Sequence, residues 1–158
     1  MIYSDRYKSP MGEIVLASDG LHLTGLYFIG NRFTPPELEL ITPNHTLDIF
    51  HMTFEWLDTY FGGRIPTSKP MLLPAGSPFQ LAVWSHLMEI PYGTTISYGS
   101  LAQKLGTKSA RAVGSAVGRN PISLIIPCHR VINANGEIGG YACGTELKCR
   151  LLKLEKAI

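Results

Sequence analysis

The sequence predicts an α+β fold: a small N-terminal β-sheet with one helix, followed by a mainly helical half that contains a helix-turn-helix. Two β-rich runs occupy residues 13–29, helical spacing begins at residue 47 and returns after residue 76, and a proline-rich stretch separates the two regions. The 158 residues suffice for one domain or two small ones, and 45% hydrophobic against 16% charged residues excludes a disordered chain. We expect two domains, residues 1–70 and 71–158.

The N-terminal half begins with strand-like material. Residues 13–17 and 21–29 are rich in β-branched and aromatic side chains and flank a turn at Asp19-Gly20. Residues 47–61 predict a helix, which ends at Gly62-Gly63. Its apolar positions at helical spacing are Phe50, Phe54, Leu57 and Phe61. The three histidines of this half are scattered, so it shows no catalytic pattern.

Residues 65–78 contain four prolines without helical periodicity and predict an extended linker. A helix should follow, with Ser77 as N-cap, Pro78 at its first position and Gln80 completing a capping box. Its predicted apolar face consists of Phe79, Val83, Trp84, Leu87 and Met88. A last helix is predicted over residues 145–156.

Two short helices around a tight turn give a helix-turn-helix outline. Ser97 caps a helix over residues 98–105, Gly106 ends it, and Ser109 caps a second helix over residues 110–119. Small residues dominate the second helix: Ala110, Ala112, Gly114, Ser115, Ala116 and Gly118. A helix this slim either packs very closely on another element or enters a narrow space such as a DNA minor groove.

Charge is distributed unevenly along the chain. Residues 1–75 hold five Lys and Arg against eight Asp and Glu, whereas residues 76–158 hold nine against four. A basic C-terminal half suggests an anionic partner such as nucleic acid, and ordinary scatter of surface charge would give the same count.

The three cysteines, Cys128, Cys143 and Cys149, form neither a disulfide framework nor a paired zinc motif. None lies in residues 1–75, so we expect no structural zinc there. The longest apolar runs are too short to span a bilayer, and charges near the N-terminus interrupt any signal peptide. We expect a cytoplasmic protein that does not bind membranes.

The adjacent pair Cys128-His129 suggests a nucleophile, because a nearby base lowers the pKa of a thiol. On an extended strand, however, neighbouring side chains point to opposite faces, so contact between them requires a turn or a bridging water. Taken alone, the pair is better explained by a buried cysteine beside an incidental histidine.

The surrounding motifs resemble the O6-alkylguanine-DNA alkyltransferases, also called methylated-DNA–protein-cysteine methyltransferases. They are Pro127-Cys128-His129-Arg130-Val131, Arg119-Asn120-Pro121, Gly139-Gly140-Tyr141, Gly76-Ser77-Pro78-Phe79-Gln80, Val83-Trp84, Ile90-Pro91-Tyr92-Gly93-Thr94, Ser97-Tyr98, Leu101-Ala102 and Ala110-Arg111-Ala112-Val113-Gly114. The resemblance covers most of residues 76–155, and Tyr60-Phe61-Gly62-Gly63 resembles the end of the family's N-terminal domain. It implies a ribonuclease-H-like topology for that domain.

The resemblance also implies a role for each matching residue. Cys128 matches the alkyl acceptor, while His129 and Glu155 match the base and its orienting carboxylate, joined to the thiol through a water. Asn120 matches the residue that braces the nucleophile segment. Tyr98 matches the tyrosine that helps to rotate the nucleotide out of the duplex and gives a proton to the departing base.

For DNA binding, the resemblance implies that the helix-turn-helix docks in the minor groove and that Arg111 fills the vacated space. Ala110 and Ser115 would lie at the DNA on the same helix. Lys104, Lys108 and Arg119 are candidate phosphate contacts, and solvated charge is the alternative for each.

The base pocket would be walled by Tyr141, Ala142, Cys143, Ile126 and Pro127. Ala142 and Cys143 depart from the residues more common in the family, which bears on the width of the pocket. Cys149, on the last helix, is expected in the core.

The implied activity is irreversible transfer of a methyl group from O6-alkylguanine, and O4-methylthymine, in double-stranded DNA to Cys128. One monomer would repair one lesion without cofactor or metal. A damage-binding relative without chemistry would lack the acceptor cysteine, and a regulator fused to a cysteine-rich module would be longer. A cysteine hydrolase built on Cys, His and Glu would show multiple turnover.

Overall fold

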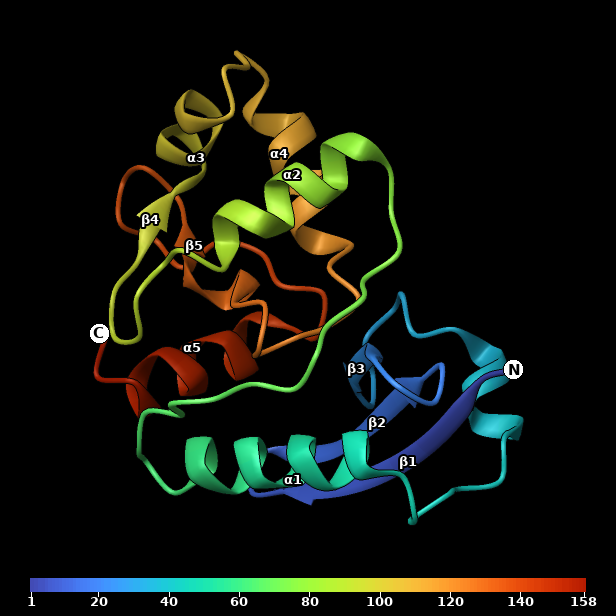
Figure 1. Ribbon diagram of the computed structural model, residues 1–158. Helices are drawn as coiled ribbons and strands as arrows, with labels where there is room; N and C mark the ends of the chain where they lie inside the picture. The colour runs from blue at the N-terminus through green and yellow to red at the C-terminus, as the bar shows by residue number, and fades with distance from the viewer. The chain divides into compact units, whose positions relative to one another are not determined.

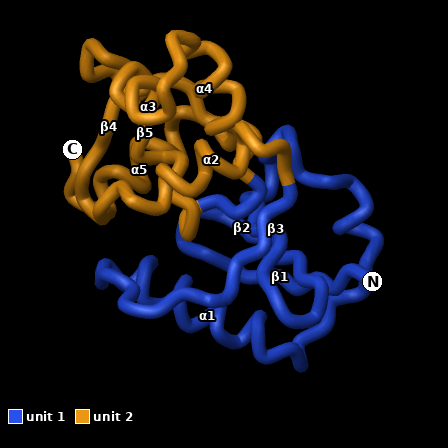
Figure 2. The backbone as a smooth tube through the Cα atoms, turned by 45° about the horizontal axis from the view of Figure 1, so that its top comes forward, with its two compact units in different colours: residues 1–75, 121–123 blue, residues 76–120, 124–158 orange.

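The computed structural model describes residues 1–158 and divides into two compact units (Figure 2). The first unit consists of Met1–Ala75 together with Pro121–Ser123, and the second of Gly76–Asn120 with Leu124–Ile158. No pattern in the sequence indicated that three residues from the later half belong to the first unit. No helix in the structure combines the length and the apolar character needed to cross a membrane.

A three-stranded antiparallel sheet forms the base of the first unit, in the order β1 (Tyr3–Ser9), β2 (Gly12–Ser18) and β3 (Leu23–Phe28) (Figure 1). The predicted strands β2 and β3 are confirmed. β1 was missed because its sequence, YSDRYKS, is polar, although its backbone pairs with β2 from end to end. Backbone hydrogen bonds between β1 and β2 therefore stabilise the sheet, although the polar side chains of β1 do not predict a buried strand.

Two segments from elsewhere in the chain pair with β3. Leu23 exchanges backbone hydrogen bonds with the predicted linker, donating to Met71 O at 2.8 Å and accepting from Leu73 N at 2.9 Å. Leu26 pairs in the same way with Pro121 O and Ser123 N, at 2.9 and 3.0 Å. At residues 71–73 the predicted linker is held in an extended conformation by its pairing with Leu23 of β3.

The predicted helix over residues 47–61 is α1 (Asp48–Phe61). Its buried positions are Ile49, Phe50, Thr53, Leu57 and Tyr60. Phe54 and Phe61 of the predicted apolar face are half-buried. Both rings stack on the ring of Tyr7, with centroid distances of 5.7 and 6.3 Å. The predicted loop before α1 contains one 3-10 helix, η1 (Pro36–Leu40).

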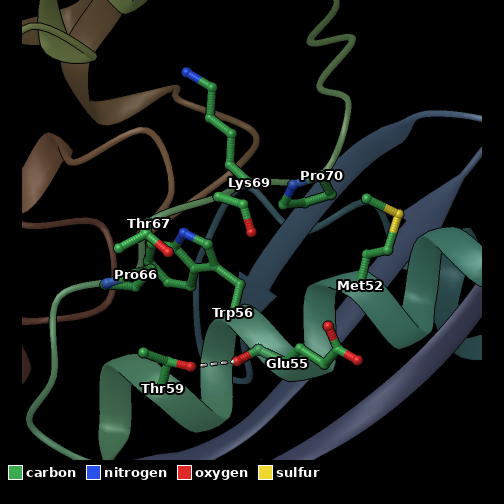
Figure 3. Close-up of a pocket in the computed structure, with 9 residues that line it drawn as sticks. Met52, Glu55, Trp56, Thr59, Pro66, Thr67, Lys69 and Pro70 are labelled. Atoms are coloured by element: carbon green, nitrogen blue, oxygen red, sulfur yellow. Dashed lines mark hydrogen bonds between the residues drawn. The ribbon is translucent and has the colours of Figure 1, made fainter.

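A polar hollow of about 150 Å³ lies between α1 and residues 66–70 (Figure 3). Figure 3 shows Trp56 beside Pro66 and Thr67, while Thr59 donates a hydrogen bond of 2.9 Å to the backbone oxygen of Glu55. The hollow contains none of the site residues predicted from the sequence.

The second unit contains four helices: α2 (Pro78–Leu87), α3 (Tyr98–Lys104), α4 (Ala110–Gly118) and α5 (Thr145–Leu154). Between them lie the 3-10 helix η2 (Cys128–Arg130) and the two-residue strands β4 (Ile96–Ser97) and β5 (Val131–Ile132), which pair in parallel. These strands were not predicted, because two residues are too few for a periodic pattern.

The predicted capping box of α2 is confirmed. Ser77 Oγ accepts from Gln80 N at 3.1 Å, and Ser77 N donates to Gln80 Oε1 at 2.9 Å. Val83, Trp84 and Leu87 of the predicted face are buried, whereas Phe79 is exposed. The helix thereby turns a narrow apolar face toward α4, with which it packs.

The small residues of α4 have two different environments. The indole Nε1 of Trp84 donates to Ala116 O at 2.9 Å, so a small side chain permits close packing of α2 and α4 there. Ala110, Ala112 and Ser115 are exposed instead. Close packing thus explains one side of the slim helix and leaves the other side open to solvent.

Candidate functional site

The Cys128-His129 pair lies in a turn of 3-10 helix, not on an extended strand. Cys128, His129 and Arg130 are all buried, and Cys128 is 6% exposed. Upstream, Leu124 adopts a left-handed backbone conformation, φ 70°, which is strained for a branched side chain. Neighbouring side chains point to opposite faces on a strand, and this segment is not a strand. The geometry therefore no longer argues against a shared role for the thiol and the imidazole.

His129 is oriented by Glu155, which follows the last turn of α5. The His129 Nε2 to Glu155 Oε2 distance is 2.5 Å, and both side chains are fully buried. With Glu155 ionised, Nε2 carries the proton of this hydrogen bond, and Nδ1 becomes the acceptor nitrogen of the neutral ring. Burial lowers the pKa of His129, while the hydrogen bond and charge of Glu155 act in the opposite direction.

Glu155 also binds Arg130. The guanidinium donates from Nε to Oε1 at 2.7 Å and from one terminal nitrogen to Oε2 at 3.2 Å. Its other terminal nitrogen donates to Ile90 O at 2.8 Å, and Gly93 N donates to Glu155 Oε1 at 3.2 Å. The carboxylate is thus held on both oxygens in a site from which water is largely excluded.

Burial raises the pKa of the Cys128 thiol, and three neighbours oppose this effect. Hydrogen bonds from Asn120 and Tyr141 favour the thiolate, as does the positive charge of Lys148. Asn120 also donates from Nδ2 to Ile126 O at 2.7 Å, which ties the segment before Cys128 to the end of α4.

Lys148 is the site residue that the sequence analysis missed. Its side chain is fully buried, donating from Nζ to Val131 O at 2.6 Å and Gly140 O at 3.1 Å. The ammonium also lies 5.7 Å from the ring centroid of Tyr98. Burial lowers the pKa of Lys148 to about 8, and the negative charge of Cys128 counteracts part of that effect. Lys148 therefore contacts the segment that follows Cys128, the glycine-rich turn and Tyr98.

A signal for Lys148 was present in the sequence. Residues 148, 151, 152 and 155 lie on one face of a helix, and the second and third are the buried Leu151 and Leu152. The helical spacing therefore put Lys148 and Glu155 on the face that is buried, although Lys and Glu are rarely buried unless they have a partner.

The predicted pocket-wall residues differ in burial. Tyr141, Ala142 and Cys143 are half-buried, whereas Ile126 and Pro127 are buried in the segment before Cys128. Cys149 was expected in the core, but it is only half-buried, because its position on α5 lies beside the buried stripe rather than within it.

The predicted DNA-binding residues lie outside the buried cluster. Those on or beside α3 and α4 are exposed: Lys104, Lys108, Ala110, Arg111, Ser115 and Arg119. Tyr98 belongs to both groups, since it begins α3 and its ring contacts Lys148. No group of three His, Cys, Asp or Glu side chains could hold a metal ion.

Two family models match the N-terminal and C-terminal parts of the chain. Residues 78–157 match the DNA binding domain of 6-O-methylguanine DNA methyltransferase, and residues 2–69 match its ribonuclease-like domain. The two matches thus give the chain both domains of the 6-O-methylguanine DNA methyltransferase class.

Full-length relatives identify the family. The chain is 41% identical to the methylated-DNA–protein-cysteine methyltransferase of Methanosarcina acetivorans and 42% identical to that of Methanosarcina mazei, and each alignment covers 98% of both chains. The chain belongs to the methylated-DNA–protein-cysteine methyltransferase family.

Solved structures agree with this assignment. The O6-methylguanine methyltransferase of Mycobacterium tuberculosis superimposes with a TM-score of 0.89 at 40% identity, covering 99% of this chain and 94% of that one. A structure of Mycobacterium tuberculosis OGT in complex with DNA gives a TM-score of 0.88 at 39% identity, covering 98% and 93%. The predicted α+β fold class, with an N-terminal sheet and a C-terminal helical half, is confirmed.

Proposed function

We propose that this protein repairs DNA by moving the alkyl group of O6-alkylguanine directly onto Sγ of Cys128. The observation that carries the proposal is a buried thiol in the same turn as a histidine whose Nε2 is held by a buried glutamate at 2.5 Å. The names of the full-length relatives support the reaction, and the DNA complex of a relative supports the substrate.

The proposed reaction begins with transfer of the Cys128 proton through a water to Nδ1 of His129. The thiolate then attacks the methyl carbon, a C–S bond forms, and the C–O bond breaks with its electron pair passing to the guanine. Tyr98 gives a proton to the departing guanine, and the proton held by the His129 imidazolium replaces it, so that the proton lost by the thiol ends on the base. The product is a neutral thioether with no route back to the thiol, so each molecule acts once and needs no cofactor.

Access to the thiol requires the alkylated nucleotide to leave the duplex, at a cost of a few kcal/mol. We propose that α3 and α4 dock in the minor groove, with Ala110 and Ser115 at the DNA and Arg111 in the vacated space. The exposed small side chains of α4 fit this role, because they let the helix lie close to the DNA backbone. Contacts with the DNA backbone do not depend on base sequence, which suits a lesion that can occur in any sequence. Lys104, Lys108 and Arg119 would contact phosphates.

The remaining roles follow from position. Asn120 braces the nucleophile segment through Ile126 O, and the wall of the base pocket comprises Tyr141, Ala142, Cys143, Ile126 and Pro127. We assign residues 1–70 to an N-terminal ribonuclease-like domain and residues 71–158 to the alkyltransferase domain. The protein would act as a cytoplasmic monomer on double-stranded DNA.

Intact-mass spectrometry after incubation with a duplex carrying one O6-methylguanine tests the proposal. The wild type should gain one methyl group, mapped to Cys128, and Cys128→Ser should gain none. Cys149→Ser is the matched control, since it removes a half-buried thiol in α5 and leaves Cys128 in place, and it should react like the wild type. An unmodified wild type that still binds the lesion would indicate a damage-binding protein, and multiple turnover would indicate a hydrolase.

A further inference from the structure

Arg130 is a buried cation in the turn that carries the nucleophile, and the proposed reaction gives it no task. It is 8% exposed and donates three hydrogen bonds, two to Glu155 and one to Ile90 O. Its guanidinium also lies 5.6 Å from the ring centroid of Tyr92. Burying an arginine costs desolvation free energy unless its charge is paired and its N–H groups are hydrogen-bonded. These contacts compensate that cost, and they also act on Glu155.

The geometry makes Glu155 a shared partner. His129 and Arg130 both contact Oε2, while Arg130 and Gly93 N both contact Oε1. An isolated buried carboxylate 2.5 Å from an imidazole would strongly favour the protonated ring. Because Arg130 already neutralises the charge of this carboxylate, Glu155 stabilises a positive charge on His129 much less.

We propose that Arg130 is a positioning residue that holds Glu155 on both oxygens and keeps His129 neutral, with Nδ1 ready to accept the thiol proton. The inference deepens the alkyl transfer proposed above and rests on it. A protonated His129 could not accept a proton from Cys128, so the reaction would stop at any pH at which the imidazolium dominates.

The other charged groups near His129 do not replace Arg130. Lys148 of α5 also disfavours the imidazolium, but its hydrogen bonds go to Val131 O and Gly140 O. The helix α2 also packs against the turn, and its one titratable side chain, His86, lies 3.5 Å from Glu89. Of the cations around His129, Arg130 is the one that binds the same carboxylate.

Single-turnover kinetics measured as a function of pH test the proposal, because they give the amplitude and the rate constant of methyl transfer separately. The amplitude of methyl transfer counts folded, active molecules, whereas the rate constant reports the chemistry of those molecules. In Arg130→Met, the acidic limb of the pH–rate profile should move about one to three pH units upward, because Glu155 then favours the imidazolium. Arg130→Lys keeps the charge and should show a smaller shift.

Glu155→Gln is the matched control of opposite sign. Removing the negative charge disfavours the imidazolium, so the acidic limb should move to lower pH. A loss of folding alone would reduce the amplitude in both variants and leave the position of the limb unchanged. An unchanged limb in Arg130→Met, or shifts of the same sign in both variants, would overturn the proposal.

A second measurement requires no variant of Arg130. Nitrogen-15 NMR of the histidines in Cys128→Ser should show His129 neutral at pH 7, with the proton on Nε2. An imidazolium at that pH would overturn the proposal even if every Arg130 variant failed to fold. Failure of the alkyl transfer itself is distinguishable, since the wild type would then gain no methyl group at any pH.

Discussion

Replacing Lys148 by Met should change how the stability of the protein depends on pH. Burial lowers the pKa of Lys148 from 10.5 to about 8, so the folded protein releases this proton more readily than the unfolded chain. Below pH 8 the cost of the buried charge is present in full, and between pH 8 and 10.5 it is progressively relieved. At 1.36 kcal/mol per pKa unit, the free energy of unfolding gains about 3 kcal/mol over this window.

The assay is urea unfolding across this window for Cys128→Ser and for the double variant Cys128→Ser/Lys148→Met. The serine removes the thiolate whose charge raises the pKa of Lys148, so the window begins no higher than pH 8. Tyrosines and Cys149 titrate in both proteins and largely cancel in the difference. The free energy of unfolding of Cys128→Ser should therefore rise with pH relative to that of the double variant.

Parallel stability curves for the two proteins would refute this reasoning. They would mean that the ammonium of Lys148 is as well solvated in the folded protein as in the unfolded chain. The two carbonyl contacts and the absence of exposed surface would then need another explanation.

Three further predictions concern single contacts. Ser77→Ala removes the capping box and should lower the free energy of unfolding by about 1 kcal/mol in urea titrations, whereas Ser68→Ala, an exposed control, should leave it unchanged. Trp84→Phe removes one of the two hydrogen bonds that Ala116 O accepts and should lower the melting temperature, at a cost of about 1 kcal/mol; an unchanged melting temperature would contradict this. Asn120→Ala removes a hydrogen bond that favours the thiolate, so methyl transfer to Cys128 should slow about tenfold in single-turnover assays at neutral pH, with the deficit shrinking as the pH rises. A deficit independent of pH would point to a loss of geometry instead.

The helices could be predicted because their signals are local. Ser77 with Gln80 forms a capping box, and Ser97 and Ser109 accept hydrogen bonds from Ser100 N and Ala112 N at the starts of α3 and α4. Each signal depends only on residues three positions apart, so chain order alone reveals it. The strands β2 and β3 were likewise visible from β-rich runs around one turn.

Elements whose stability comes from distant partners could not be predicted in the same way. The polar strand β1 exists because β2 offers a full ladder of backbone hydrogen bonds, and Pro121–Ser123 joins the first unit through its pairing with Leu26. Backbone hydrogen bonding does not depend on side-chain identity, so neither pairing leaves a pattern in the residues.

By itself, the sequence determined the family and pointed to Cys128 as the proposed nucleophile, because adjacent residues such as Cys128-His129 and the motifs around them are read along the chain. The tertiary structure alone decided the charge environment of that nucleophile. It brought Glu155 within 2.5 Å of His129, placed Arg130 on the same carboxylate, and buried Lys148 beneath Tyr98. The physical reason is that desolvation and charge pairing depend on distance and burial, which a linear order of residues does not contain.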